Sequence, residues 1–214
     1  MPPVVSIVGK SSTGKTTFLE KLVRELKARG YRVGTIKHSH HSIDFHDPKK
    51  DSFRHAQAGA AATLVSSTTS FQIIKPVPRE LNVEELVRHF GNDFDLILTE
   101  GFSRGNAPKV EIHRKEAGPL LEVASKLFAV VTDEPLDTDA QQFGLEDIKG
   151  VADLIENRFI KPGQPRLSLY VNGRAVEISA KQAALLKNLV NDLEPDFKET
   201  GINSLELHYH PYRK

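Results

Sequence analysis

The stretch Gly9-Lys10-Ser11-Ser12-Thr13-Gly14-Lys15-Thr16 decides the fold, because it fits the phosphate-binding pattern G-x-x-x-x-G-K-[ST]. It follows the apolar run of residues 4–8, which is typical of a buried strand. After it, apolar side chains recur at helical spacing from Phe18 to Leu26, and Gly30 ends the helix. Strand, loop and helix are the context that this motif requires, so a plain glycine turn is the weaker interpretation.

The spacing of the motif has a physical reason in phosphate binding. Two glycines let the backbone wrap closely around a phosphate, while successive N–H groups and the start of the helix point at the anion. Lys15 would reach the β- and γ-phosphates, and the Thr16 hydroxyl would bind Mg²⁺. The predicted nucleotide contacts in this segment are Gly9, Ser12, Thr13, Gly14, Lys15, Thr16 and Thr17.

Composition narrows the class of protein. The 214 residues suffice for one good core with a small appendage. The net charge of +1 comes from 29 basic and 28 acidic side chains, so no nucleic-acid or membrane surface is indicated. The chain has no cysteine, which excludes disulfides and thiolate metal sites. With no signal segment before the first strand, we expect a cytoplasmic protein.

A histidine-dense polar segment, residues 37–55, follows the second predicted strand at residues 31–37. It stands where a parallel sheet places its ligand-facing loops. Lys37 and Arg54 suit anion contact, and Asp44 suits Mg²⁺-bound water or a general-base role. A transition-metal site is the weaker alternative, because the histidine spacing matches no closed site.

A second site residue is predicted at Glu100, where the apolar strand of residues 95–100 ends before Gly101. An acid at the end of such a strand, downstream of a phosphate loop, holds Mg²⁺ through water or polarises the attacking water. Asp95 lies at the opposite end of the same strand and is therefore too distant.

Further strands are predicted at residues 63–66, 71–74, 109–113 and 127–131. The segment 109–113 alternates between apolar and polar residues, and the segment 127–131 is typical of a buried strand. Residues 56–62 are helix-permissive, Asn82 caps a helix whose apolar stripe reaches Phe90, and another helix spans residues 146–158. Asp133, after the strand of residues 127–131, could accept hydrogen bonds from guanine N1 and N2. Since Asn-Lys-x-Asp is missing from the chain, the identity of the base stays open.

The sequence thus predicts an α/β fold, with a mostly parallel sheet in a P-loop NTPase domain and a small C-terminal α+β appendage. The nucleotide-binding domain covers residues 1–160, the linker residues 161–165 and the appendage residues 166–214. In the appendage, Asn172-Gly173 forms a hairpin turn that pairs Leu169 with Val176 and Leu167 with Ile178. A helix capped by Ser179 and Gln182 follows, and residues 204–208 could add a strand.

Five stretches together resemble the molybdopterin-guanine dinucleotide biosynthesis protein B (MobB) family over residues 3–160. They are the phosphate loop, Ile36-Lys37-His38 with His40-His41, Asp51 to His55 with Ala58-Gly59-Ala60, Glu100-Gly101-Phe102, and Pro108-Lys109-Val110-Glu111. The resemblance implies a GTP-binding, weakly GTP-hydrolysing homodimer that uses Mg²⁺. Its implied role is as an accessory to the nucleotidyltransferase MobA, which joins GMP to molybdopterin. Molybdopterin is therefore a further candidate ligand of this chain.

The resemblance also assigns residues. Gly14, Lys15 and Thr16 match the phosphate and Mg²⁺ residues, and Glu100 matches the acid of the second motif. The loop kept near the nucleotide contains His38, His41, Asp44, Asp51 and Arg54. The chain departs from the pattern at His46, where many members have an acid, and at Ser103, where a basic residue is usual and Arg104 could supply the charge.

The leading hypothesis is a slow GTPase that acts as an adaptor for a MobA-type molybdenum cofactor guanylyltransferase. Its predicted catalytic residues are Lys15, Asp44 and Glu100, its metal ligands Thr16 and Glu100, and its remaining nucleotide contacts Lys37, His38, Arg54 and Asp133. One alternative is a P-loop small-molecule kinase, although only Arg104 and Arg114 could serve an arginine-rich lid between residues 103 and 125. The other is a metallochaperone GTPase that uses the histidine-rich loop.

Overall fold

The computed structural model describes residues 2–39, 51–90, 94–122, 126–161, 169–171, 174–176 and 179–193. In chain order its elements are β1 (Val4–Val8), α1 (Lys15–Ala28), β2 (Val33–Lys37), α2 (Asp51–Gln57), β3 (Thr63–Ser66), β4 (Phe71–Ile74), α3 (Val83–Val87), β5 (Leu96–Glu100), β6 (Lys109–Ile112), the 3₁₀ turn η1 (Lys115–Ala117), β7 (Leu127–Thr132), β8 (Gln141–Gly144), α4 (Ile148–Ile155), the π-helical turn η2 (Glu156–Ile160), β9 (Leu169–Val171), β10 (Arg174–Val176) and α5 (Ala180–Leu193).

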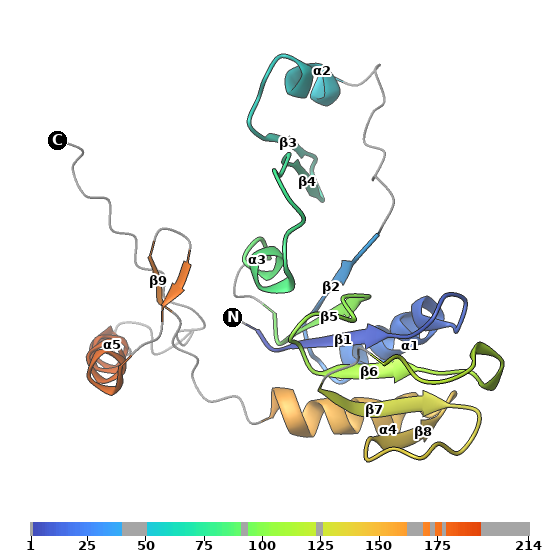
Figure 1. Ribbon diagram of the computed structural model, residues 1–214. Helices are drawn as coiled ribbons and strands as arrows, with labels where there is room; N and C mark the ends of the chain where they lie inside the picture. Colours follow the sequence, from blue (N-terminus) through green and yellow to red (C-terminus); the bar gives the residue numbers. More distant parts are fainter. Residues whose placement is uncertain are drawn as a thin grey trace.

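A parallel sheet forms the body of the protein (Figure 1). Within the described residues it has six strands in the order β2-β5-β1-β6-β7-β8. β1 lies inside the sheet and pairs in parallel with both β5 and β6. Its apolar sequence suits a strand covered on both faces. The predicted α/β fold is therefore confirmed, and the carboxyl ends of all six strands meet at one edge.

The main hydrophobic core lies between the sheet and the helices α1 and α4, which occupy the same side of it (Figure 1). Leu22 and Leu26 of α1, one turn apart, are fully buried, as are Val151 and Ile155 of α4. The apolar stripe predicted after the phosphate loop therefore faces the sheet.

α3 contributes to a second, smaller core on the other face of the sheet, where Val83 and Val87 pack against Ile36 and Ile97. Asn82 caps α3 as expected: its side chain accepts a hydrogen bond from the Glu85 N–H at 2.8 Å, and the Glu85 carboxylate accepts one from the Asn82 N–H at 3.0 Å. The helix is shorter than predicted, because the chain turns after Val87 and places Phe90 against the core from that turn.

Three elements of the structure differ from the sequence prediction. β6 was expected to alternate, but all four of its residues are buried, with Lys109 0% and Glu111 1% exposed. Most of the helix-permissive segment 56–62 is not helical: α2 begins at Asp51 and ends at Gln57. β8 was not predicted, because this edge strand exposes Gln141 and Gln142 and lacks apolar alternation.

β3 and β4, both predicted as strands, form an antiparallel ribbon that is separate from the six-stranded sheet. Figure 1 shows the ribbon and α2 standing away from the sheet, beyond the carboxyl end of β2. Four large apolar side chains of the ribbon, Leu64, Val65, Phe71 and Ile73, are exposed.

Part of the appendage is described. β9 pairs antiparallel with β10 and sets Leu169 opposite Val176, as the turn chemistry predicts. The Gln182 N–H donates to the Ser179 hydroxyl at 3.3 Å, and the Ser179 N–H donates to the Gln182 side-chain oxygen at 2.9 Å, which is the predicted capping box of α5. The Leu167–Ile178 pair, residues 162–165 of the linker and the strand expected at residues 204–208 lie outside the described residues.

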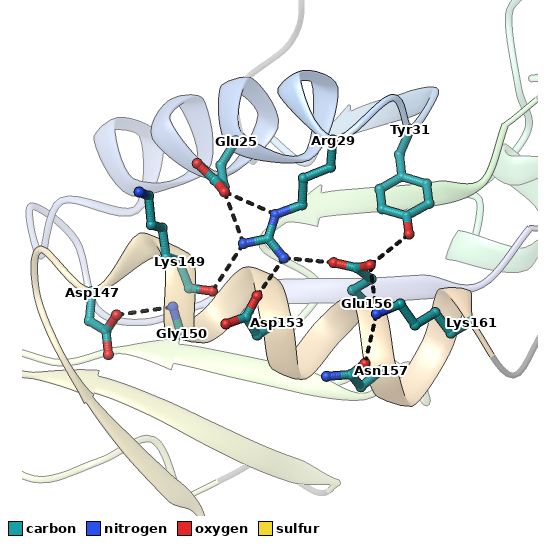
Figure 2. Close-up of polar contacts among 10 residues, drawn as sticks. All are labelled: Glu25, Arg29, Tyr31, Asp147, Lys149, Gly150, Asp153, Glu156, Asn157 and Lys161. Carbon is teal, nitrogen blue, oxygen red and sulfur yellow. Dashed lines mark hydrogen bonds and ion pairs between the residues drawn. The ribbon is translucent and has the colours of Figure 1, made fainter.

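An ion-pair cluster joins the carboxyl-terminal end of α1 to α4 and η2 (Figure 2). Arg29 pairs with Glu25 at 2.9 Å, with Asp153 at 2.6 Å and with Glu156 at 2.6 Å. Tyr31 donates a hydrogen bond to Glu156 as well. These contacts, with Arg29 first and then Lys161 and Tyr31, lower the pKa of Glu156 to about 2.

Helices long and apolar enough to cross a bilayer are absent from the described part of the chain.

Candidate functional site

The phosphate loop, residues 9–16, connects β1 to α1 in a conformation that only glycine can adopt at its first position. Gly9 has φ 145°, and a Cβ there would lie 2.4 Å from the Ile112 carbonyl oxygen. Gly14, at φ 94°, is the N-cap of α1. Both required glycines of the motif are thus explained by the backbone that they permit.

The start of α1 suits an anion. Its N-cap Gly14 gives no side-chain cap, and its first turn, which lies wholly within the described residues, contains no acidic side chain. The first N–H groups of a helix have no partner within the helix, and the helix dipole makes this end electropositive. Phosphate is the ligand that such a loop and helix end bind best.

Four predicted site residues come together beside this helix end. The Thr16 hydroxyl donates a hydrogen bond to Glu100 Oε1 at 2.8 Å, and Lys37 Nζ lies 3.5 Å from the same oxygen. Lys15 Nζ donates to the Lys10 carbonyl oxygen at 2.5 Å. Burial lowers the pKa of Lys15, as does Lys37, whereas the nearby Glu100 raises it.

This meeting of side chains follows from the sheet order. β5 lies between β1 and β2, and its last residue, Glu100, is level with Lys37 at the end of β2. Glu100 and Lys37, at the carboxyl ends of neighbouring strands, therefore lie together beside Thr16 of the phosphate loop.

His38 lies at the edge of this group. Its backbone N–H donates to the Glu100 carbonyl at 3.0 Å, its Nε2 lies 2.5 Å from Glu80 Oε1, and its ring packs on Phe102 at a centroid distance of 4.6 Å. Gly101 has φ 99°, and a Cβ there would lie 3.1 Å from the His38 Cβ. The glycine after Glu100 therefore leaves space for His38.

Two cations that were not predicted at the site, Lys10 and Arg114, connect the phosphate loop to the segment after β6. Arg114 Nε donates to the Thr13 carbonyl at 3.4 Å, and Lys10 Nζ donates to the Ala117 carbonyl at 2.7 Å. Asp133 supports the same arrangement: it accepts a hydrogen bond from the Lys115 N–H at 2.9 Å and lies 3.5 Å from Arg114. The first of these contacts is the largest cause that lowers the pKa of Asp133.

A cavity of about 110 Å³ opens beside the phosphate loop. It is lined by Thr13, Gly14, Thr17, Phe18, Lys21, Ile112, Arg114, Leu145 and Glu146. Lys21 and Glu146 form an ion pair with 2.5 Å between Nζ and Oε2. Glu146 follows β8. Because this strand was not predicted, no sequence pattern placed Glu146 at the site.

Buried polar groups lie under the loop that carries Arg114. Glu111 Oε1 accepts a hydrogen bond from the Leu121 N–H at 2.9 Å, and its other oxygen has no partner among the described residues. Burial raises the pKa of Glu111. Lys109 donates to the carbonyls of Gly105 and Ala107, and burial lowers its pKa. These groups hold the loops that flank β6.

Other predicted site residues are not brought to this group. Arg54 lies on α2 and pairs with Asp51 at 3.5 Å, and Figure 1 shows α2 well away from the phosphate loop. Asp44, His41 and His46 lie outside the described residues. Within the part that is described, no three His, Cys, Asp or Glu side chains gather closely enough to hold a metal ion.

The parallel sheet, the glycine-permitted loop, the lysine and the acid-paired threonine define a P-loop protein of the nucleotide-binding α/β class.

Comparison with known proteins identifies the family within this class. The model of the family described as molybdopterin guanine dinucleotide synthesis protein B (MobB) matches residues 4–133. The molybdopterin-guanine dinucleotide biosynthesis adapter protein of Haemophilus influenzae is 38% identical over 157 residues, which are 72% of this chain and 88% of that protein. The Escherichia coli protein of the same name is 37% identical over 161 residues, 72% of this chain and 92% of that protein. The chain therefore belongs to the MobB family.

Solved structures agree. Bacillus subtilis MobB has a TM-score of 0.59 at 25% identity and covers 73% of this chain and 98% of its own. A MobB homologue from Bacillus stearothermophilus has a TM-score of 0.54 at 27% identity, with 73% and 97% covered.

Proposed function

We propose that this protein is a cytoplasmic, GTP-binding and slowly hydrolysing adapter in molybdenum cofactor biosynthesis. In this role it assists a MobA-type guanylyltransferase that attaches GMP to molybdopterin. The observation that carries the proposal is the Thr16–Glu100 hydrogen bond of 2.8 Å beside Lys15, in a chain of the MobB family. The names of its relatives support the role in molybdenum cofactor biosynthesis, and the phosphate loop supports nucleotide binding.

Mg²⁺ suits the donors at this position, because a hydroxyl and a carboxylate are hard oxygen ligands. Thr16 and Glu100 would hold it, and when bound it would neutralise charge on the phosphates. Glu100 would keep its carboxylate oriented through Thr16 and Lys37.

The remaining roles fall to this chain's own groups. Lys15 would exchange its contact with the Lys10 carbonyl for the β- and γ-phosphates. The backbone N–H groups from Ser12 to Thr17 would surround the phosphates. Asp44 stays our candidate general base, His38 and Arg54 stay candidate nucleotide contacts, and molybdopterin stays a candidate second ligand.

We also propose a homodimer that forms through the β3–β4 ribbon. Leu64, Phe71 and Ile73 expose large apolar surfaces on a two-stranded ribbon that pairs with no other described strand. An isolated two-stranded ribbon is marginally stable in water, and exposed apolar patches of this kind mark interfaces.

Isothermal titration calorimetry with GTP and ATP in the presence of Mg²⁺ tests the nucleotide assignment. We expect GTP to bind more tightly. The variant Lys15→Ala should weaken GTP binding at least about tenfold, because a hydrogen bond to a charged group contributes about 1.5–3 kcal/mol. Lys27→Ala, at an exposed lysine of the same helix, is the matched control. A preference for ATP, or normal GTP binding by Lys15→Ala, would contradict the proposal.

Reconstitution tests the pathway. Guanine dinucleotide formation by the transferase is measured with wild-type protein, with Lys15→Ala and without either. We expect wild-type protein to increase product formation and Lys15→Ala to lose the increase. Equal product in all three reactions would refute the adapter role even if GTP binds.

A further inference from the structure

Among the described residues, the proposed site has groups for the phosphates and for Mg²⁺ but no contact yet assigned to the nucleotide base. The sequence lacks Asn-Lys-x-Asp, and the strand-end residue expected to read the base, Asp133, is engaged with Lys115 and Arg114. Other groups near the phosphate loop are therefore candidates for contacting the base.

Sheet order gives the direction in which a nucleotide would lie. The phosphate loop follows β1; Glu100 ends β5 on one side of it, while β6, β7 and β8 lie on the other side. The cavity of about 110 Å³ is lined from that second side, by Arg114 after β6 and by Leu145 and Glu146 after β8. A nucleotide whose terminal phosphate faces Glu100 would extend its nucleoside toward this cavity.

The dimensions and walls of the cavity suit one planar ring. Sites that enclose a whole drug-sized ligand have volumes of about 300–1,000 Å³, so this smaller cavity fits a fragment such as the base. Phe18, Ile112 and Leu145 provide apolar wall, and Arg114 provides a planar guanidinium that can stack on a ring.

Its polar groups suit the edge of guanine. Glu146 and Lys21 both line the cavity and form an ion pair, and the Glu146 side chain is 82% exposed, so its carboxylate can turn toward a ligand. Guanine presents the acceptor O6 beside the donors N1–H and N2–H. A carboxylate can accept from both donors while the ammonium donates to O6. The adenine edge offers one donor group and one acceptor, and thus one fewer contact.

We propose that Glu146 and Lys21 select guanine, with Glu146 accepting from N1–H and N2–H and Lys21 donating to O6, while Asp133 holds Arg114 against the ring. This assignment rests on the nucleotide-binding function proposed above. It names two specificity-determining residues at the rim of the cavity, and neither is one of the phosphate or Mg²⁺ groups.

The variant Glu146→Gln tests the assignment. Xanthine carries a carbonyl where guanine carries the 2-amino group, and a glutamine amide can donate to that carbonyl. Calorimetry with GTP, XTP and ATP, each with Mg²⁺, should show wild-type protein preferring GTP over XTP. Glu146→Gln should bind GTP at least about tenfold more weakly, bind XTP more tightly than wild type, and leave ATP within about twofold.

Two further variants make the result interpretable. Glu20→Gln removes a carboxylate from an exposed position of α1 outside the cavity and should leave all three affinities unchanged. Asp133→Asn tests the rival reader and should leave the ratio of GTP to XTP affinity as in wild type. Circular dichroism establishes that every variant is folded.

The outcomes separate the two proposals. If Glu146→Gln keeps the wild-type ratio of GTP to XTP affinity while Lys15→Ala weakens GTP binding as expected, the assignment is overturned and the proposed function stands. If Asp133→Asn changes that ratio instead, Asp133 is the reader and the assignment is overturned. If wild-type protein binds none of the three nucleotides, both proposals fail.

Discussion

The central strands of the sheet and the strands of the β3–β4 ribbon are built from similar residues but differ in burial. In β5, Leu96, Ile97 and Leu98 are each 0% exposed, whereas Leu64 of β3 is 58% exposed and Phe71 of β4 is 69% exposed. β5 has a strand on each side and helices over both faces. The ribbon strands have only each other.

The difference shows that a sequence pattern predicts backbone conformation but does not by itself predict burial. Apolar and β-branched side chains favour extended backbone, and both regions form the strands that this preference predicts. Whether the side chains are then buried depends on what packs over them. Helices cover the apolar side chains of the sheet, whereas those of the ribbon stay exposed in the described structure.

The largest expected effect is a difference in stability between two leucine-to-alanine variants, one in the sheet and one in the ribbon. Leu98→Ala should lower the free energy of unfolding by about 2–5 kcal/mol, because it leaves a cavity in the core. Leu64→Ala should change it by less than about 0.5 kcal/mol, since its side chain is already in water.

Urea unfolding followed by circular dichroism measures both variants, since the chain has no tryptophan for fluorescence. Protein concentration is kept low so that association contributes little. Equal destabilisation by the two variants would mean that the ribbon is buried in the monomer, and the contrast between the two regions would then be false.

A second prediction concerns association. Phe71→Lys should raise the dimer dissociation constant at least about tenfold, because it removes an apolar anchor and places a charge in the proposed interface. Analytical ultracentrifugation measures the constant. GTP affinity should remain at the wild-type value.

Gln141→Lys, which adds the same charge to the exposed edge strand β8, is the control and should leave association unchanged. If Phe71→Lys associates as wild type does, the ribbon is not the dimer interface.

The smallest effect is the pH dependence of the ion-pair cluster that holds α1 against α4 and η2 (Figure 2). The pKa of Glu156 is about 2 in the folded protein, below its ordinary value of 4.5. Its contribution to stability is therefore present above pH 4.5 and is lost as the pH falls from there toward 2.

Thermal unfolding of wild type and Glu156→Gln across this pH range measures the contribution. The variant should have the lower Tm at neutral pH, and the difference should shrink as the pH falls. A difference in Tm that does not depend on pH would show that the Glu156 charge contributes nothing.

The sequence predicted those parts of the molecule where local pattern and tertiary environment agree. β1, the phosphate loop and α1 follow one another with the expected spacing, and Glu100 ends its strand beside Thr16. The two strands β3 and β4 and the cap of α3 also agree, because strand preference and cap chemistry act over a few residues.

The missed parts depend on contacts between distant segments. β8 is polar and forms through pairing with β7, so no periodicity marked it. Glu146 was placed at the start of a predicted helix and not at the site, because the strand before it was not predicted. Arg114 reaches the phosphate loop because β6 pairs with β1, and residue spacing does not report which strand lies next to which. Glu111 is buried in β6 despite its charge, against the alternation that was expected.

The direct pairing of β2 with β5 has a consequence for the evolution of this chain. Val33 stands opposite Leu96 and Lys37 opposite Glu100. The register between β2 and β5 therefore does not depend on the length of the segment that connects the two strands. Residues 38–95 connect these two neighbouring parallel strands, from the carboxyl end of β2 to the amino end of β5. Insertions and deletions in this segment can remodel the surface offered to partners, while the six-stranded sheet keeps its register.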